Sequence, residues 1–164
     1  MRMNVIDNFL NEDDYLNIKH MVLGDWRNFP WFYTPHVATD EDNDIYFVHT
    51  FQEKEFDLES PYLHKLQPIL KKLEIEDLWR VKGNLFPNQN KFVEHQPHVD
   101  YDEPHQAAIY YINSNNGYTK LNDGTKVDSV ANRLLLFDGS KHHSSTNCTN
   151  DKIRVNINFN YIKI

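Results

Sequence analysis

Two side chains that commonly bind metal ions lie two positions apart in the sequence His98-Val99-Asp100. They close a β-prone run over 92–100. In an extended chain, residues two positions apart point to the same side, so both side chains can reach one ion. The triplet alone is weak evidence, because the chain contains nine histidines and 24 acidic residues. Its significance depends on a third ligand from elsewhere in the chain.

Such a ligand is available just after the apolar run 134–137, where His142 and His143 are adjacent. Two imidazoles and one carboxylate on one face of an ion form a facial triad. A facial triad leaves three positions open on an octahedral ferrous ion, enough for a bidentate keto acid and dioxygen, whereas a closed four-ligand zinc site leaves none. On residue type alone, either histidine satisfies this chemistry.

A row of polar side chains follows eleven residues after His143. Between Ile153 and Phe159 polar and apolar residues alternate, so Arg154, Asn156 and Asn158 share one face of a predicted strand. Inside a barrel this row needs partners, because an unpaired buried charge is strongly unfavourable. A ligand carboxylate would be a suitable partner, since arginine binds it through two parallel hydrogen bonds. Asn156 can add a hydrogen bond to the same group.

The elements that must position these residues are mainly strands. From residue 78 onward, short β-prone runs alternate with turn residues at intervals of about ten, as is typical of an antiparallel barrel or sandwich. Strong turn signals occur at 115–117 and 122–124. This pattern favours a jelly roll. The expected strands are 45–51, 78–86, 92–100, 107–112, 117–121, 133–138 and 152–162.

Two helices are expected before this region. Asn11 is suited to cap a helix over 12–24, which has an acidic first turn and ends at a glycine. Ser60 and the following proline predict the start of a second helix, in which leucines recur over 63–73 and Pro68 should produce a kink. The expected fold class is therefore mainly β, with two or more helices packed on one side of a jelly roll.

The order of these motifs resembles the prolyl-4-hydroxylase-like branch of the Fe(II)- and 2-oxoglutarate-dependent oxygenases. The resemblance covers roughly residues 78–162, about half of the chain. It rests on His98-Val99-Asp100, the runs 108–113, 116–119 and 132–137, His143 and Arg154. It implies a double-stranded β-helix, also called cupin-like, in which His98, Asp100 and His143 bind Fe(II) and Arg154 binds the C5 carboxylate of 2-oxoglutarate. The family's spacing from Phe137 favours His143 over His142 as the third ligand.

The chain departs from the family's usual pattern in two places. Many members have a tyrosine on the strand before the His-x-Asp motif that contacts the co-substrate, but the segment 82–87 contains none. Asn84 and Tyr110 are the candidates for that contact. The usual paired glycines before threonine are replaced by Asn116 and Gly117, followed by Tyr118 and then Thr119.

Composition narrows the class of protein further. With 164 residues and no repeat or long linker, the chain is expected to form a single domain over 1–164. A formal charge of -7 disfavours binding to phosphate backbones, so no nucleic-acid partner is expected. Cys148 is the one cysteine, and no signal peptide or membrane-spanning run is apparent. We expect a cytoplasmic protein, or one of the host cytoplasm if the source is viral, since small members of this type are common in phage genomes.

The function implied by the resemblance is hydroxylation of a small-molecule or peptide substrate. By analogy with the family, the group hydroxylated would be a peptidyl or free amino-acid side chain. The reaction would use Fe(II), 2-oxoglutarate and dioxygen and release succinate and CO2. An alternative is a non-catalytic jelly-roll or cupin-like module that binds a metal or another ligand. Such a module needs no keto acid, so the predicted burial of Arg154 argues against it.

Overall fold

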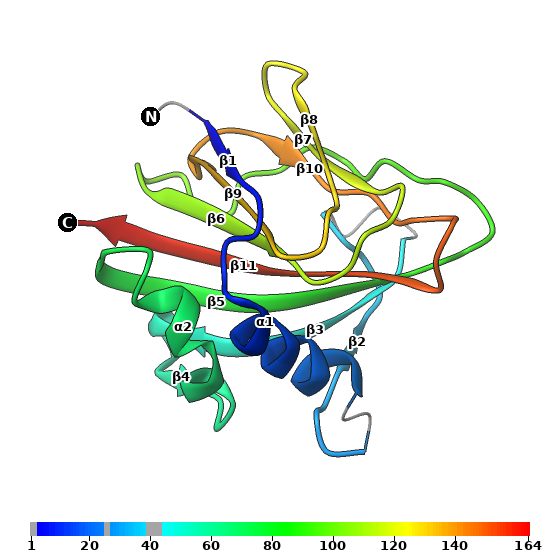
Figure 1. The fold of residues 1–164 in the computed structure, drawn as a ribbon. Coiled ribbons are helices and arrows are strands. Elements are labelled where there is room, and N and C mark those ends of the chain that lie inside the picture. The colour runs from blue at the N-terminus through cyan, green and yellow to red at the C-terminus, as the bar shows by residue number, and fades with distance from the viewer. Residues whose placement is uncertain (1–2, 25–26, 39–43) are drawn as a thin grey trace.

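The computed structural model describes residues 3–24, 27–38 and 44–164, and most of its regular structure is β (Figure 1). The helices are α1 (Glu12–Lys19), which continues as a π-helical turn (His20–Gly24), and α2 (Gln67–Leu70), with 3-10 turns at Lys54–Phe56 and Leu63–Leu66. The strands are β1 (Asn4–Ile6), β2 (Phe32–Thr34), β3 (Tyr46–Glu53), β4 (Leu58–Glu59), β5 (Ile75–Pro87), β6 (Gln106–Tyr111), β7 (Tyr118–Leu121), β8 (Lys126–Asp128), β9 (Arg133–Asp138), β10 (His143–Ser144) and β11 (Ile153–Lys163).

These strands form two antiparallel sheets. The larger has the order β1-β9-β6-β11-β5-β3-β2, with β4 also paired to β3, and the smaller has the order β10-β7-β8. The smaller sheet lies on one side of the larger sheet, and both helices lie on the other side (Figure 1). The fold is therefore a jelly roll with helices on one side, which confirms the expected fold class.

The two faces of the large sheet pack against different cores, as the alternation along its strands requires. On the helical side, Val155, Ile157 and Phe159 of β11 join a cluster that includes Ile18 of α1 and Ile69 of α2. On the other side, residues of β6 and β9 pack against the small sheet. This second cluster consists of Ala107, Ile109, Tyr111, Leu121, Val127, Leu135 and Phe137.

A polar strip crosses the face that looks toward the small sheet. The alternate residues of β11 lie opposite alternate residues of its neighbour β5, in an unbroken antiparallel register through this part of the strands. The cross-strand pairs are Arg154 with Phe86, Asn156 with Asn84, Asn158 with Lys82, and Asn160 with Arg80. The predicted polar face of β11 is thus confirmed, and β5 contributes charged residues to the same strip.

The first helix begins as predicted, because the Asn11 side chain accepts a hydrogen bond of 2.9 Å from the backbone N–H of Asp14. The prediction of one continuous, kinked second helix was wrong. The segment is a 3-10 turn followed by the short helix α2, and Pro68 lies in the first turn of α2, where proline replaces an N–H that has no helical partner. Recurring leucines at spacings of three and four suit either helix type. No helix in the described part of the chain is long and apolar enough to cross a membrane.

One predicted strand does not form. The segment 92–100 makes only isolated bridges, Glu94 with Thr146 and His98 with His143. The segment is held at one point to β10 and at the other to the chain just after β10, without adding a regular strand to the small sheet. Short pairings at β1, β2, β4, β8 and β10 were not predicted, because strands of two or three residues carry too little periodicity to be recognised.

Candidate functional site

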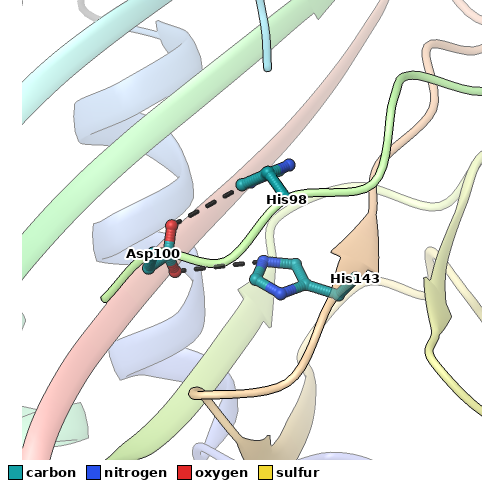
Figure 2. Close-up of side chains that lie close together, drawn as sticks. All are labelled: His98, Asp100 and His143. Atoms are coloured by element: carbon teal, nitrogen blue, oxygen red, sulfur yellow. Dashed lines mark ion pairs between the residues drawn. The ribbon is translucent and has the colours of Figure 1, made fainter. Parts of the chain in front are cut away.

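The three predicted metal ligands converge from two separate segments (Figure 2). His98 and Asp100 lie between β5 and β6, whereas His143 is the first residue of β10. The two histidine backbones hold the segments together: the N–H of His98 donates to the His143 carbonyl at 3.0 Å, and the N–H of His143 donates to the His98 carbonyl at 2.9 Å. Pairing of the backbones therefore brings residues more than 40 positions apart to one place.

The side chains point toward one another in a compact group (Figure 2). One ligand atom from each of His98, Asp100 and His143 lies within 4.8 Å of the others. Nε2 of His98 lies 4.0 Å from Oδ1 of Asp100, and Nε2 of His143 lies 3.9 Å from Oδ2 of the same carboxylate. Ligand atoms that each lie about 2 Å from one ion are about 3 Å from one another. A modest adjustment of these side chains would therefore let each residue give one atom to a shared cation.

Backbone carbonyls orient both imidazoles. Nδ1 of His143 lies 3.2 Å from the Lys141 carbonyl oxygen, and Nδ1 of His98 lies 3.4 Å from the Gln96 carbonyl oxygen. A carbonyl oxygen only accepts hydrogen bonds, so these contacts favour a proton on Nδ1 and leave a lone pair on Nε2. The Nε2 atoms that face Asp100 are thus the ones prepared to bind a cation.

The charge states also favour metal binding. Burial lowers the pKa of His98 to about 4, and the neighbouring His143 adds to this effect. Burial likewise lowers the pKa of His143. Burial opposes ionisation of Asp100, but Arg80, His143, Lys82 and the Asn160 hydrogen bond together outweigh it, and the pKa of this carboxyl falls well below its usual range. At neutral pH the site therefore offers two neutral imidazoles and one carboxylate, the forms that bind a divalent cation.

Three side chains of the polar strip fix the Asp100 carboxylate. The Nη2 atom of Arg80 lies 2.6 Å from Oδ1, and the side-chain amides of Asn158 and Asn160 donate to Oδ2 at 2.7 and 3.0 Å. The Asp100 side chain is only 4% exposed. Partners of this kind hold a ligand carboxylate in one orientation and satisfy its remaining lone pairs.

Arg154 is fully buried, as the sequence predicted, at 0% exposure. Its guanidinium donates to the Ser129 hydroxyl at 2.7 Å, the Thr146 carbonyl at 3.1 Å and the Thr119 hydroxyl at 3.3 Å. All three acceptors are neutral, and burial lowers the pKa of Arg154, with only the Tyr111 and Cys148 side chains acting against this. In the described part of the chain, no carboxylate compensates this buried cation.

One pocket links the triad to the surroundings of Arg154. His98, Asp100 and His143 line it together with residues of the strip and the small sheet. The Arg154 guanidinium contacts two further wall residues: it bonds to Thr119 and lies over the Phe86 ring at 5.4 Å. The remaining wall residues are Val37, Tyr46, Lys82, Asn84, Ile109, Ser145, Asn156 and Asn158. Arg154 itself thus lies behind two wall residues of the pocket that the triad lines.

Asn84 and Asn156, two predicted contacts of the co-substrate, both line this pocket. The Asn84 amide donates to the Asn156 side-chain oxygen at 3.0 Å, which connects β5 to β11 across the polar strip. The pair leaves the Asn156 amide group available to a ligand as a donor.

The prediction for Tyr110 was wrong. Its ring belongs to the core on the helical side and packs against Phe9, with ring centroids 6.2 Å apart. Its hydroxyl donates a hydrogen bond of 2.9 Å to the Asn132 side-chain oxygen. The cause is strand alternation: Ile109, its neighbour in β6, lines the pocket, so Tyr110 must point to the opposite face.

Of the two adjacent histidines, His143 is buried in the site and His142 is exposed. This agrees with the choice that the family resemblance favoured. Sequence reasoning missed Arg80 and Lys82, which reach the site from β5. The alternation Arg80-Val81-Lys82-Gly83-Asn84 was the available signal, since it places every second, polar residue on one face.

Comparison with known proteins finds similarity in structure only. No family model and no curated protein sequence matches the chain. A prolyl-4-hydroxylase from Pseudomonas putida matches with a TM-score of 0.70 at 13% identity, over 99% of this chain and 92% of the other. A Trichoplax adhaerens prolyl hydroxylase, in complex with a hypoxia inducible factor peptide fragment, matches with a TM-score of 0.69 at 16% identity, over 98% and 83% of the two chains.

A viral enzyme also matches. The collagen prolyl hydroxylase of Paramecium Bursaria Chlorella virus-1, in complex with 2OG, gives a TM-score of 0.63 at 11% identity, over 99% of this chain and 97% of the other. The match spans nearly the whole of both chains, so the amino-terminal helices are included as well as the β region. The chain therefore has the fold of the 2-oxoglutarate- and Fe(II)-dependent oxygenases of the prolyl-4-hydroxylase type.

Proposed function

We propose that this protein is a 2-oxoglutarate- and Fe(II)-dependent dioxygenase that hydroxylates a small-molecule or peptide substrate. The main support is the combination of a His-Asp-His group with a buried, uncompensated arginine beside the same pocket. A metal module alone has no use for the arginine, and an anion-binding module alone has no use for the triad. A dicarboxylic keto acid that chelates a metal uses both.

In this proposal His98, Asp100 and His143 hold the ferrous ion. Arg154 binds the C5 carboxylate of 2-oxoglutarate, Asn156 adds a hydrogen bond to it, and Asn84 orients Asn156. The donor set fits the ion, since mixed imidazole and carboxylate ligands suit Fe(II). The bound group supplies the oxidising chemistry: oxidative decarboxylation of the keto acid by dioxygen releases succinate and CO2 and oxidises a substrate C–H bond. The chain positions the reactants and excludes stray water.

The substrate class proposed from the fold is a peptidyl or free amino-acid side chain. This follows by analogy, because one structure of the same fold contains a bound peptide fragment. The alternative, a non-catalytic cupin-like or jelly-roll module that binds a metal or another ligand, shares the triad and the barrel. It leaves the buried charge of Arg154 with neutral partners only among the described residues.

Succinate formation tests the proposal. Protein loaded anaerobically with Fe(II) is mixed with 2-oxoglutarate and then with air, and succinate is measured over several hours at stoichiometric protein concentration. We expect succinate from the unaltered protein and its loss in His98→Ala. The matched control is His142→Ala, which removes an exposed histidine beside the site and should retain turnover. Absence of succinate in the unaltered protein, or equal amounts in both variants, would favour the binding module.

A further inference from the structure

Lys82 is a pocket residue to which the proposed reaction assigns no role. It lies on the inner face of β5 between Arg80 and Asn84, opposite Asn158 of β11. It lines the same pocket as the three triad residues. Its position therefore places an ammonium group in the space where the reactants would meet.

This ammonium has no polar partner in the described part of the chain. Arg80, two positions earlier, pairs with Asp100 at 2.6 Å. Nζ of Lys82, by contrast, forms no hydrogen bond or ion pair with any described residue. Nζ of Lys82 lies 5.9 Å from the centroid of the Tyr46 ring. A lysine ammonium carries three donors, and leaving them unsatisfied in a partly buried position is unfavourable.

The electrostatic surroundings agree with this picture. Burial lowers the pKa of Lys82 to about 8, and Arg80 adds to the effect, while Asp100 and Glu53 act against it. Most Lys82 side chains are still charged at neutral pH. The cation is therefore present but poorly compensated, and an incoming anion would relieve it.

The proposed function accounts for the other charges of the pocket. Arg80 compensates Asp100, and Arg154 has a carboxylate of 2-oxoglutarate as its partner. The second carboxylate and the keto oxygen of this co-substrate would bind the metal in the proposal. Among the described residues that line the pocket, this leaves Lys82 as the one Lys or Arg side chain, and it has no assigned partner. Resting on that function, we propose that Lys82 binds a carboxylate of the primary substrate, so that the substrate is an acid.

Two sources of this carboxylate have the same chemistry: a free amino acid or other small acid, and an acidic side chain in a peptide. In either case the contact would orient the substrate against the triad and reject neutral analogues, because a neutral group would leave the ammonium unpaired. Lys82 would thus determine specificity, and it would not hold the metal or 2-oxoglutarate.

Binding to protein that cannot turn over tests this without relying on activity. The protein is loaded with Zn(II) and 2-oxoglutarate, and NMR or calorimetry follows the binding of the twenty free amino acids and their carboxamides. Blocked peptides containing Glu or Gln at one position distinguish the two sources. We expect at least one acid to bind about tenfold or more tightly than its amide or its Gln counterpart.

Lys82→Met should remove this preference, and Lys82→Arg should retain it. The matched control Lys65→Met removes the same charge from an exposed position and should change nothing. The affinity for 2-oxoglutarate should be the same in all variants, and a thermal melt verifies that each is folded. Equal binding of acids and amides, no binding by any probe, or a preference that survives in Lys82→Met would overturn the inference.

A further outcome separates this inference from the proposed function. If Lys82→Met lost affinity for 2-oxoglutarate instead, Lys82 would be a contact of the co-substrate, and this inference would be wrong while the proposed function stood. If the unaltered protein failed to bind 2-oxoglutarate at all, the proposed function would fail. A preference for acids that depends on Lys82 would still support a carboxylate site in that case.

Discussion

The side chain of Arg154 occupies the space that a side chain at Gly117 would need. A Cβ at position 117 would clash with Cδ of Arg154 and lie 2.6 Å from the Asn147 carbonyl oxygen. Gly117 belongs to the turn before β7, where the resemblance to prolyl-4-hydroxylase-like oxygenases would lead one to expect a pair of glycines. This glycine is thus required for the burial of the arginine.

Gly117→Ala should therefore weaken 2-oxoglutarate binding without weakening metal binding. The added methyl group must displace either the arginine or the backbone at Asn147, and a displaced guanidinium no longer forms two parallel hydrogen bonds with a carboxylate. We expect the dissociation constant of 2-oxoglutarate to rise about tenfold or more. Calorimetric titration of the metal and then of the co-substrate measures both. Unchanged affinity for 2-oxoglutarate would contradict either the displacement of Arg154 or its role in binding the co-substrate.

Arg80→Met should make the protein depend on metal for its stability. Removal of the guanidinium leaves the Asp100 carboxylate without its charged partner, a change that costs about 3 kcal/mol for a buried pair. A divalent cation at the triad would supply the missing charge, so metal should stabilise this variant more than the unaltered protein. Thermal unfolding with and without Zn(II) measures the difference. An equal metal-induced rise in Tm in both proteins would contradict the proposed role of Arg80.

Lys82→Met should stabilise the metal-free protein at pH 7. The pKa of Lys82 is lowered to about 8 in the folded protein from its ordinary value of 10.5, first by burial and then by Arg80. Between these values the unfolded chain binds more protons than the folded one, so the unfolding free energy of the unaltered protein rises with pH. The variant's advantage, at most about 3 kcal/mol, should be present below pH 8 and shrink toward pH 10.5. Urea unfolding at pH 7 and pH 10 tests this, and an advantage that does not change with pH would refute it.

Tyr110→Phe should affect stability and leave co-substrate binding unchanged. The Tyr110 hydroxyl donates to Asn132 in the core on the helical side, so its loss should cost about 1 kcal/mol of unfolding free energy. Denaturant unfolding and a 2-oxoglutarate titration measure the two quantities. A weakened 2-oxoglutarate affinity with unchanged stability would restore Tyr110 as a candidate for the co-substrate contact.

The parts of the site that the sequence predicted are those encoded in local patterns. The two-residue spacing of His98 and Asp100 sets their common direction, and the alternation around Arg154 predicts its burial, because both follow from the geometry of an extended chain. Local patterns could not show whether the extended segment 92–100 forms a regular strand or only isolated bridges, such as that of His98 with His143. β propensity indicates an extended backbone but not whether a continuous partner strand exists.

The charged residues of β5 show which part of the site local sequence patterns could not predict. Arg80 reaches Asp100 because β5 pairs with β11 in a register that places it opposite Asn160. That register depends on contacts across the whole sheet, and no local feature of the segment specifies it. For the same reason Tyr110 was assigned to the wrong face: a residue's side of the sheet can be deduced only once one neighbour is placed.

The most direct test of the central claim is an anaerobic titration of the protein with Fe(II) and 2-oxoglutarate, followed in the visible spectrum. The account predicts a weak charge-transfer band from the chelated keto acid, with one ion per chain, and its loss in His143→Ala but not in His142→Ala. An intact, folded protein that binds Fe(II) and yet develops no band on addition of 2-oxoglutarate would contradict it.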